Sequence, residues 1–215
     1  MPSTSGNGGQ IRVAGTGRVL VAPVTLPPAG AGEPAPVPTP RTTTDDWPAA
    51  HWQDLGFTTT DGIKFNKKEK IDPVDTWQSA TPARFIYSDR DLTVKFQLLQ
   101  MNKQTLAFFM GIPATEIKKT TTPDQSTPPK DVPVPDTYEF LLPSNPQKDE
   151  RALGIEFKDG SDITYRFIIP RGQVTETEEL GLTRTGALKL GVTFTALDGP
   201  NGELAKWIMK DKAYA

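Results

Sequence analysis

The side chains that could do chemistry in this sequence are one histidine, His51, and several pairs of carboxylates. The chain has no cysteine and therefore no thiol nucleophile, and one histidine cannot supply a two-histidine metal site. The carboxylate pairs fall in expected turns or on a polar strand, where solvated acids are common; they are Asp72/Asp75, Asp89/Asp91 and Glu176/Glu178. We therefore expect no catalytic residue, no metal site, no cofactor and no enzymatic activity.

Composition narrows the class of protein further. The net charge is −2, which does not favour a nucleic-acid-binding surface. The basic run 67–70 is short and interrupted by Glu69, so we interpret it as solvated. No apolar run approaches the length of about 18 residues that suggests a membrane span, and the first residues lack the pattern of a secretory signal. We expect no insertion into a membrane.

The most informative stretch is 83–111. Phe85 and Tyr87, then alternate positions from Leu92 to Leu98, predict a hairpin with one buried face and a turn at 88–91. Asn102 then predicts the N-cap of a short apolar helix, which Gly111 should end.

Further strands are expected on both sides of this stretch. Asp61-Gly62 and Asp159-Gly160 predict tight turns between apolar segments, and the second gives the clearest hairpin in the sequence. The expected strands are 18–22, 137–142, 153–157, 163–169, 173–179, 188–196 and 205–209. The predicted fold class is therefore mainly β, an antiparallel sandwich or barrel-like domain with one short flanking helix.

Proline-rich and polar segments suggest how the chain is divided. Residues 1–48 hold nine of the 21 prolines and predict an extended N-terminal arm, followed by a β-domain over 49–215. Residues 66–82 and 113–136 are expected as long loops, which in compact domains are often functional. An ordered proline-rich arm needs a surface to hold it, and we expect a neighbouring subunit to provide that surface.

The order of short motifs resembles the major tail proteins, or tail tube proteins, of long-tailed phages of actinobacteria. The fold also resembles the tube protein of type VI secretion systems. The resemblance covers most of the chain and depends on the order of its motifs. The matching stretches are Gly17-Arg-Val-Leu-Val-Ala-Pro23, Trp52-Gln-Asp-Leu-Gly-Phe57, Thr60-Asp-Gly-Ile-Lys-Phe65, Trp77-Gln-Ser79, Leu92-Thr-Val-Lys-Phe96, 102–111 and 192–207.

The resemblance implies a structural virion protein that self-assembles into stacked hexameric rings, forming a tail tube that conducts DNA. It implies synthesis in the host cytoplasm, a place in the virion tail, and partners such as the tape measure, tail terminator and distal tail proteins. DNA would pass without specific binding. The resemblance also implies that loop 66–82 reaches the next ring, with contacts from Asn66, Lys67, Lys68, Asp72, Asp75, Trp77 and Gln78.

Two features of the sequence agree with such a subunit. Trp77 in a long polar loop is a candidate interface anchor, although it could instead fold back onto its own domain. A wall that DNA slides along should be acidic or neutral, since basic contacts to phosphates add affinity. We expect Glu176, Glu178, Lys189 and Thr193 to line the channel; the alternative for the two glutamates is the outer surface.

Two other classes of protein stay open at this point. A soluble β-sandwich binding module of the carbohydrate or adhesin type would expose aromatic side chains around a cleft and stay monomeric. A β-rich hydrolase is disfavoured because the chain has one histidine and no cysteine.

Overall fold

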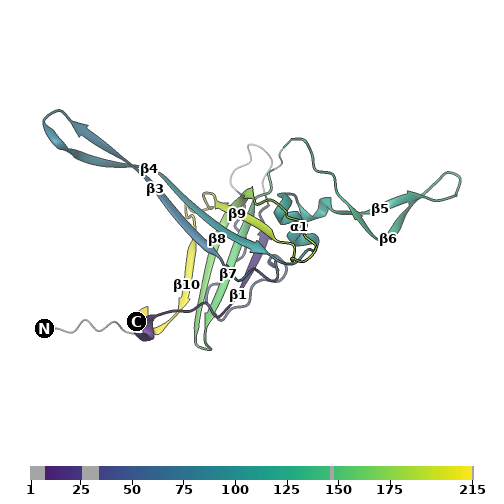
Figure 1. Ribbon diagram of the computed structural model, residues 1–215, viewed down its shortest axis with the longest axis horizontal. Helices are drawn as coiled ribbons and strands as arrows, with labels where there is room; N and C mark the ends of the chain where they lie inside the picture. Colours follow the sequence, from purple (N-terminus) through teal and green to yellow (C-terminus); the bar gives the residue numbers. More distant parts are fainter. Residues whose placement is uncertain (1–7, 26–33, 146–147, 215) are drawn as a thin grey trace.

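A curled antiparallel sheet forms the body of the molecule, and two β-hairpins project from it to opposite sides (Figure 1). The computed structural model describes residues 8–25, 34–145 and 148–214. Three short 3-10 helices lie at Gly8–Gln10, Ala114–Glu116 and Lys212–Tyr214. The strands and the α-helix are β1 (Thr16–Pro23), β2 (Gln53–Asp54), β3 (Lys64–Thr76), β4 (Ser79–Leu98), α1 (Lys103–Met110), β5 (Lys118–Pro123), β6 (Asp131–Glu139), β7 (Arg151–Asp159), β8 (Ile163–Thr177), β9 (Leu190–Ala196) and β10 (Lys206–Lys210).

The segment after β2 connects the two sides of the curled sheet. Its strand order is β2-β1-β7-β8-β9-β4-β3, and β10 pairs with the first half of β8. The amide of Leu55 donates to Val19 of β1, and the amide of Thr59 donates to Gln97 of β4, at 2.9 and 3.0 Å. The predicted fold class, mainly antiparallel β with one short α-helix, is confirmed for the described residues.

Helix α1 closes the inner side of the curled sheet. Phe108 is fully buried and stacks between Phe96 of β4 and Phe194 of β9, with ring centroids 6.1 and 6.0 Å away. Strand β9 alternates as predicted: Val192 and Phe194 point into the core, and Thr193 and Thr195 point to the opposite face.

The predicted ends of α1 are confirmed. The Asn102 side chain accepts hydrogen bonds from the amides of Gln104 and Thr105 at 2.9 and 3.0 Å, and the Thr105 hydroxyl accepts one from the Asn102 amide. This reciprocal pair is a capping box. Gly111 follows the helix with a φ of 64°, the left-handed conformation that glycine adopts without strain.

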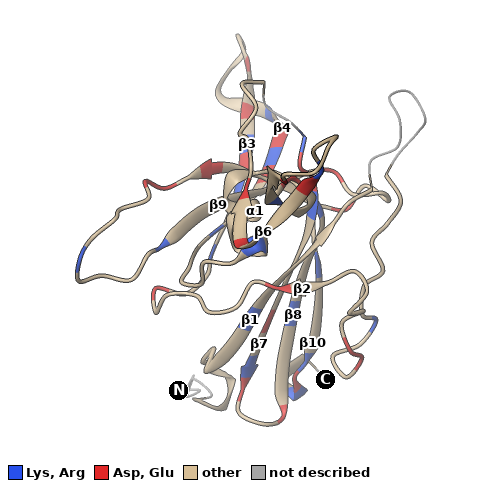
Figure 2. Ribbon diagram, turned by 90° about the vertical axis from the view of Figure 1, so that its right-hand side faces the viewer, with Lys and Arg blue, Asp and Glu red and all other residues tan. Residues whose placement is uncertain are grey.

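The turn predicted at 88–91 is wrong, because β4 runs without interruption from Ser79 to Leu98. The polar residues are matched across the ribbon by charges on β3, so a composition typical of a turn forms a strand. The facing pairs are Lys68 with Asp91, Glu69 with Arg90, and Lys70 with Asp89. Figure 2 shows both signs of charge interspersed along β3 and β4.

Regular pairing also replaces the irregular loops that polarity predicts for 66–82 and 113–136. The first segment forms most of β3, the turn at Trp77 and Gln78, and the start of β4. The second forms β5 and β6, which pair only with each other in the described structure. The division of the chain into 1–48 and 49–215 stays a prediction.

The described part of the proline-rich N-terminal segment packs on the protein's own sheet, and its expected contact with a neighbouring subunit stays a prediction. Residues 34–52, which we call the strap, cross the outer face over β1, β7 and β8 with Trp47 and Trp52 buried against it. The Trp52 indole donates to the Pro38 carbonyl at 2.7 Å. A Cβ at Gly154 would lie 2.4 Å from the Trp47 ring, so glycine there lets the indole reach the sheet.

A buried ion pair fastens the strap. Glu156 of β7 accepts from Arg166 of β8 at 2.5 Å and from the Trp47 indole at 3.1 Å. Arg166 also donates to the strap carbonyls of Thr42 and Asp45 at 2.8 and 2.6 Å. Desolvation acts to raise the pKa of Glu156, but the hydrogen bonds from Trp47 and Arg166 outweigh it and hold the pKa below its usual value.

Candidate assembly surfaces

The outer half of the β3–β4 hairpin, residues 71–87, projects beyond the sheet (Figure 1), and we call it the arm. Trp77 lies at its tip and is 98% exposed, so it does not fold back onto its own domain. The seven residues predicted for the contact with the next ring all lie on this hairpin. Asn66, Lys67, Lys68, Asp72 and Asp75 are on β3, and Trp77 and Gln78 form the turn.

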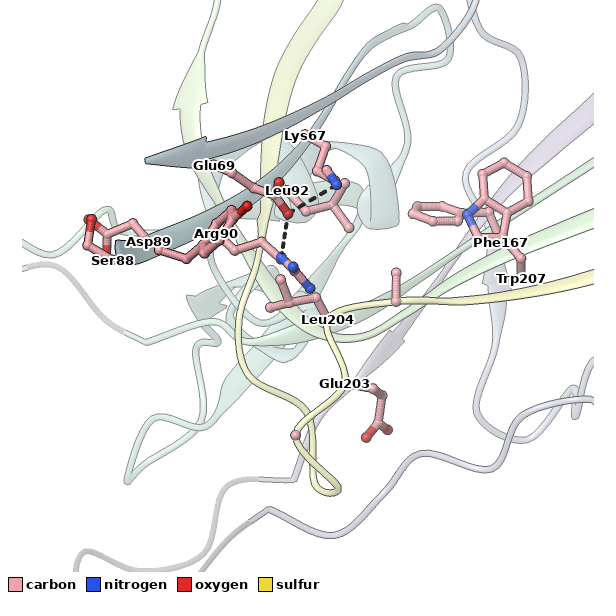
Figure 3. A pocket seen from close by; sticks show the side chains of 13 residues that line it. Lys67, Glu69, Ser88, Asp89, Arg90, Leu92, Phe167, Glu203, Leu204 and Trp207 are labelled. Atoms are coloured by element: carbon pink, nitrogen blue, oxygen red, sulfur yellow. Dashed lines mark ion pairs between the residues drawn. The ribbon is translucent and has the colours of Figure 1, made fainter. Parts of the chain in front are cut away.

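The hairpin leaves the sheet beside a small charge network. Glu69 lies 3.1 Å from the Lys67 amine and 2.8 Å from Nε of Arg90, and Figure 3 shows both cations directed at its carboxylate. The hydrogen bond from Lys67 is the largest cause of the lowered pKa of Glu69, and Arg90 adds to it. The network therefore favours the charged form of Glu69 at the base of the arm.

An open groove of about 650 Å³ lies between this network and the chain leading into β10 (Figure 3). Its apolar side includes Leu204 and two packed aromatic rings, Phe167 and Trp207, whose centroids are 4.7 Å apart. Phe65 of β3 packs edge-on against Phe167 at 4.7 Å. Trp207 is 45% exposed, so the groove offers apolar surface to another molecule.

The predicted channel residues come together only in part. Glu176 and Glu178 share one face with Thr193, as register places them, but Thr193 is buried and Lys189 lies exposed just before β9. The glutamates are partnered by Lys95 of β4, 3.9 Å from Glu176, and by Gln97, which donates to Glu178 at 2.5 Å. We call Lys95, Gln97, Glu176 and Glu178 the polar face; its two β4 members were missed, although the alternation from Leu92 to Leu98 marks them.

A bulge in β8 changes one detail of this face. Strict alternation places Thr175 on the side opposite Glu176, but the register shifts between Val174 and Glu176. The Thr175 hydroxyl therefore lies 2.8 Å from the Thr195 hydroxyl, on the same side as the glutamates.

The ends of the described chain are clasped together. Asp211 receives two hydrogen bonds from the Arg12 guanidinium, at 2.5 and 2.7 Å, and a third from the Tyr165 hydroxyl. These bonds, from Arg12 first and then Tyr165, hold the pKa of Asp211 well below its usual range. We call these three residues the clasp.

The curled sheet and the uncovered arm together present apolar and charged surface to other molecules. The profile of the phage tail tube protein family matches residues 4–215, so the chain belongs to this family. The protein is thus a structural component of the virion tail that assembles with itself and with other tail components. No curated protein matches the chain. The resemblance to tail tube proteins of actinobacterial phages in particular, and to the type VI secretion tube protein, stays a prediction.

The described residues contain no group of three or more histidine, cysteine, aspartate or glutamate side chains placed to hold a metal ion. None of the described helices is long and apolar enough to cross a membrane.

Proposed function

We propose that copies of this protein form hexameric rings that stack into the tail tube, and that the genome passes through the tube without specific binding. The observation that carries the proposal is the arm, with Trp77 98% exposed at its tip. An isolated two-stranded ribbon is marginally stable in water, and a large exposed aromatic side chain is a common interface anchor. Family membership supplies the partner, because tail tube proteins assemble with themselves.

The stacking contact is the second part of the proposal. The β3–β4 hairpin reaches the next ring. Trp77 and Gln78 at its tip make the foremost contacts, and the other predicted residues are Asn66, Lys67, Lys68, Asp72 and Asp75 of β3. The tape measure, tail terminator and distal tail proteins meet the ends or the lumen of the tube, and the subunit is made in the host cytoplasm before assembly.

The polar face is the proposed lumen wall. Each exposed Lys or Arg contact to a phosphate releases counterions and adds affinity, which would slow the passage of DNA. Here the one lysine, Lys95, lies 3.9 Å from Glu176, and Glu178 adds a further negative charge. The face is therefore acidic overall, which suits a surface that must not hold DNA.

Electron microscopy of the concentrated purified protein tests the assembly, together with light scattering. We expect rings or tubes. A protein that stays monomeric at high concentration would overturn the proposed function and favour a monomeric binding module.

Charge reversal tests the lumen wall. Changing Glu176 and Glu178 to Lys should leave tubes intact and slow DNA ejection, most at low salt where screening is weakest. The matched control changes Glu116 and Glu139, near and on the β5–β6 hairpin, to Lys, with the same change in net charge. Equal ejection rates in both variants would place the polar face outside the lumen.

A further inference from the structure

The acids and the hydrogen-bond donors of the polar face lie on strands that are not neighbours, because β9 runs between β8 and β4. Two rows of residues cross these strands. In the first row, Thr193 of β9 pairs with Glu176 on one side and with Lys95 on the other. With Thr193 between them, the Glu176 carboxylate and the Lys95 amine lie 3.9 Å apart, which makes an ion pair but no hydrogen bond.

The second row has a glycine in the middle position. Gly191 of β9 pairs with Gln97 of β4, and its carbonyl accepts a hydrogen bond from the Glu178 amide at 2.9 Å. A Cβ at Gly191 would lie 2.2, 2.5 and 2.7 Å from Oε2, Cδ and Cγ of Glu178. The outer half of the Glu178 side chain therefore lies across β9, in the space that a side chain at position 191 would fill. There its carboxylate accepts a hydrogen bond from Nε2 of Gln97 at 2.5 Å.

Glycine at position 191 provides space rather than an unusual backbone conformation. Gly191 is not among the glycines with a positive φ. Glycine inside a strand weakens it and often marks a place where another group approaches closely. Here the approaching group is the Glu178 carboxylate, and the threonine of the first row leaves no such path. Gly191 thus permits a direct hydrogen bond between two strands that β9 separates.

The partners of the two glutamates are side chains that can bind DNA. Phosphate oxygens accept hydrogen bonds from lysine and glutamine side chains, whereas an ionised carboxylate has no hydrogen to donate. In each row, the donor on β4 faces an acid of the same subunit. Such a donor is masked, in the sense that it must leave the carboxylate before it can bind a phosphate.

We propose that Glu176 and Glu178 keep the lumen wall from holding DNA by masking the donors of Lys95 and Gln97, and that Gly191 is the positioning residue for the second mask. The inference rests on the proposed function, since it takes the polar face as the lumen wall. It goes beyond repulsion by an acidic wall, because masking depends on which donor each carboxylate contacts. Two variants with the same net charge can therefore differ.

DNA ejection from virions that carry variant subunits tests the mask over Gln97. Glu178→Ala and Gly191→Ala should both free the Gln97 amide, although only the first changes the charge of the wall. Each should slow ejection by about two- to tenfold, the factor expected for one added hydrogen bond. Gly181→Ala is the matched control, since a Cβ there has no heavy atom within 4 Å, and it should eject at the wild-type rate. Electron microscopy of the tails checks that each variant assembles.

Removing the donor separates masking from lost charge and from a structural defect. Gln97→Met keeps an unbranched side chain but has no hydrogen to donate. Added to Gly191→Ala or to Glu178→Ala, it should restore the wild-type ejection rate. Repulsion alone predicts that Gln97→Met with Glu178→Ala stays slow, because its net charge equals that of Glu178→Ala. A double variant that stays slow, or wild-type ejection from Gly191→Ala, would overturn the inference.

The salt dependence of ejection distinguishes the two donors. Glu176→Ala frees an ammonium group, whose contact with a phosphate releases counterions, so its slowing should weaken steeply as salt rises. Gly191→Ala frees a neutral amide, so its slowing should change little with salt. The same salt dependence in both variants would contradict the inference. Failure of the proposed lumen wall is a separate result, in which changing Glu176 and Glu178 to Lys slows ejection no more than its control does.

Discussion

The β7–β8 hairpin and the arm are both two-stranded antiparallel ribbons, but their side chains have opposite surroundings. In the β7–β8 hairpin, Leu153, Ile155 and Phe167 are 0%, 1% and 2% exposed. In the arm, Phe85 and Tyr87 are 56% and 69% exposed, although both are large aromatic side chains. The sequence predicted a buried face for Phe85 and Tyr87, and that prediction is wrong for the single chain. The first hairpin is covered by α1 inside and by the strap outside, whereas the arm has no layer from its own chain on either face.

The comparison indicates that folding and assembly depend on separate sets of residues. Burial of apolar side chains stabilises the body, because those side chains leave water when the chain folds. The apolar side chains of the arm stay in water in the single subunit and can leave it only against another molecule. Substitutions in the two hairpins should therefore affect different measurements.

The largest expected effect is on the core. Phe108→Ala removes the ring stacked between Phe96 and Phe194 and should lower the free energy of unfolding by about 3–5 kcal/mol, measured by urea denaturation. Phe85→Ala in the arm is the matched control and should change it by less than about 0.5 kcal/mol. Equal losses in the two variants would remove the distinction between the hairpins.

The next effect is on the strap. Glu156→Gln leaves Arg166 without its carboxylate under the strap and should cost about 3 kcal/mol, since breaking a buried ion pair leaves a charge uncompensated. Thermal melting measures the loss of stability. Tryptophan fluorescence should change as well, because the Trp47 indole donates a hydrogen bond to Glu156. Glu116→Gln, which breaks the exposed pair with Lys118, is the control and should cost less than about 0.5 kcal/mol. A control as damaging as Glu156→Gln would contradict the account of the strap.

Local signals in the sequence were sufficient for much of the body. Asn102 and Gly111 bound α1 because capping depends on residues within one helical turn. Gly160, with a φ of 67°, makes the turn of the β7–β8 hairpin that Asp159-Gly160 predicts. These features need no knowledge of distant contacts.

The features that sequence reasoning missed depend on partners far along the chain. Residues 88–91 have the composition of a turn, but they continue the β3–β4 ladder, where Asp89, Arg90 and Asp91 face opposite charges on β3. The strap is proline-rich, and its ordering comes from Arg166 and Glu156, more than a hundred residues away, which have no local pattern. The bulge that brings Thr175 to the polar face is likewise set by pairing with β9. Trp77 was predicted as an interface anchor, and its exposure at the arm's tip agrees with that role.

The smallest expected effect is on the clasp and depends on pH. Because the pKa of Asp211 is lowered in the folded protein, its contribution to stability is fully present above the unfolded value of about 4 and is lost as the pH falls below it. The difference in melting temperature between the wild type and Asp211→Asn should therefore be largest near neutral pH and should shrink in acid. A difference that stays constant from neutral to acid pH would contradict the clasp.

Replacing residues 71–87 with a short Gly/Ser turn between Lys70 and Ser88 tests the central claim most directly, because it removes the arm and leaves the sheet and charge network intact. The melting temperature of the unassembled protein and the growth of tubes, seen by electron microscopy, are measured on the same sample. We predict unchanged melting and no tubes. Normal tubes from the shortened protein would contradict the account.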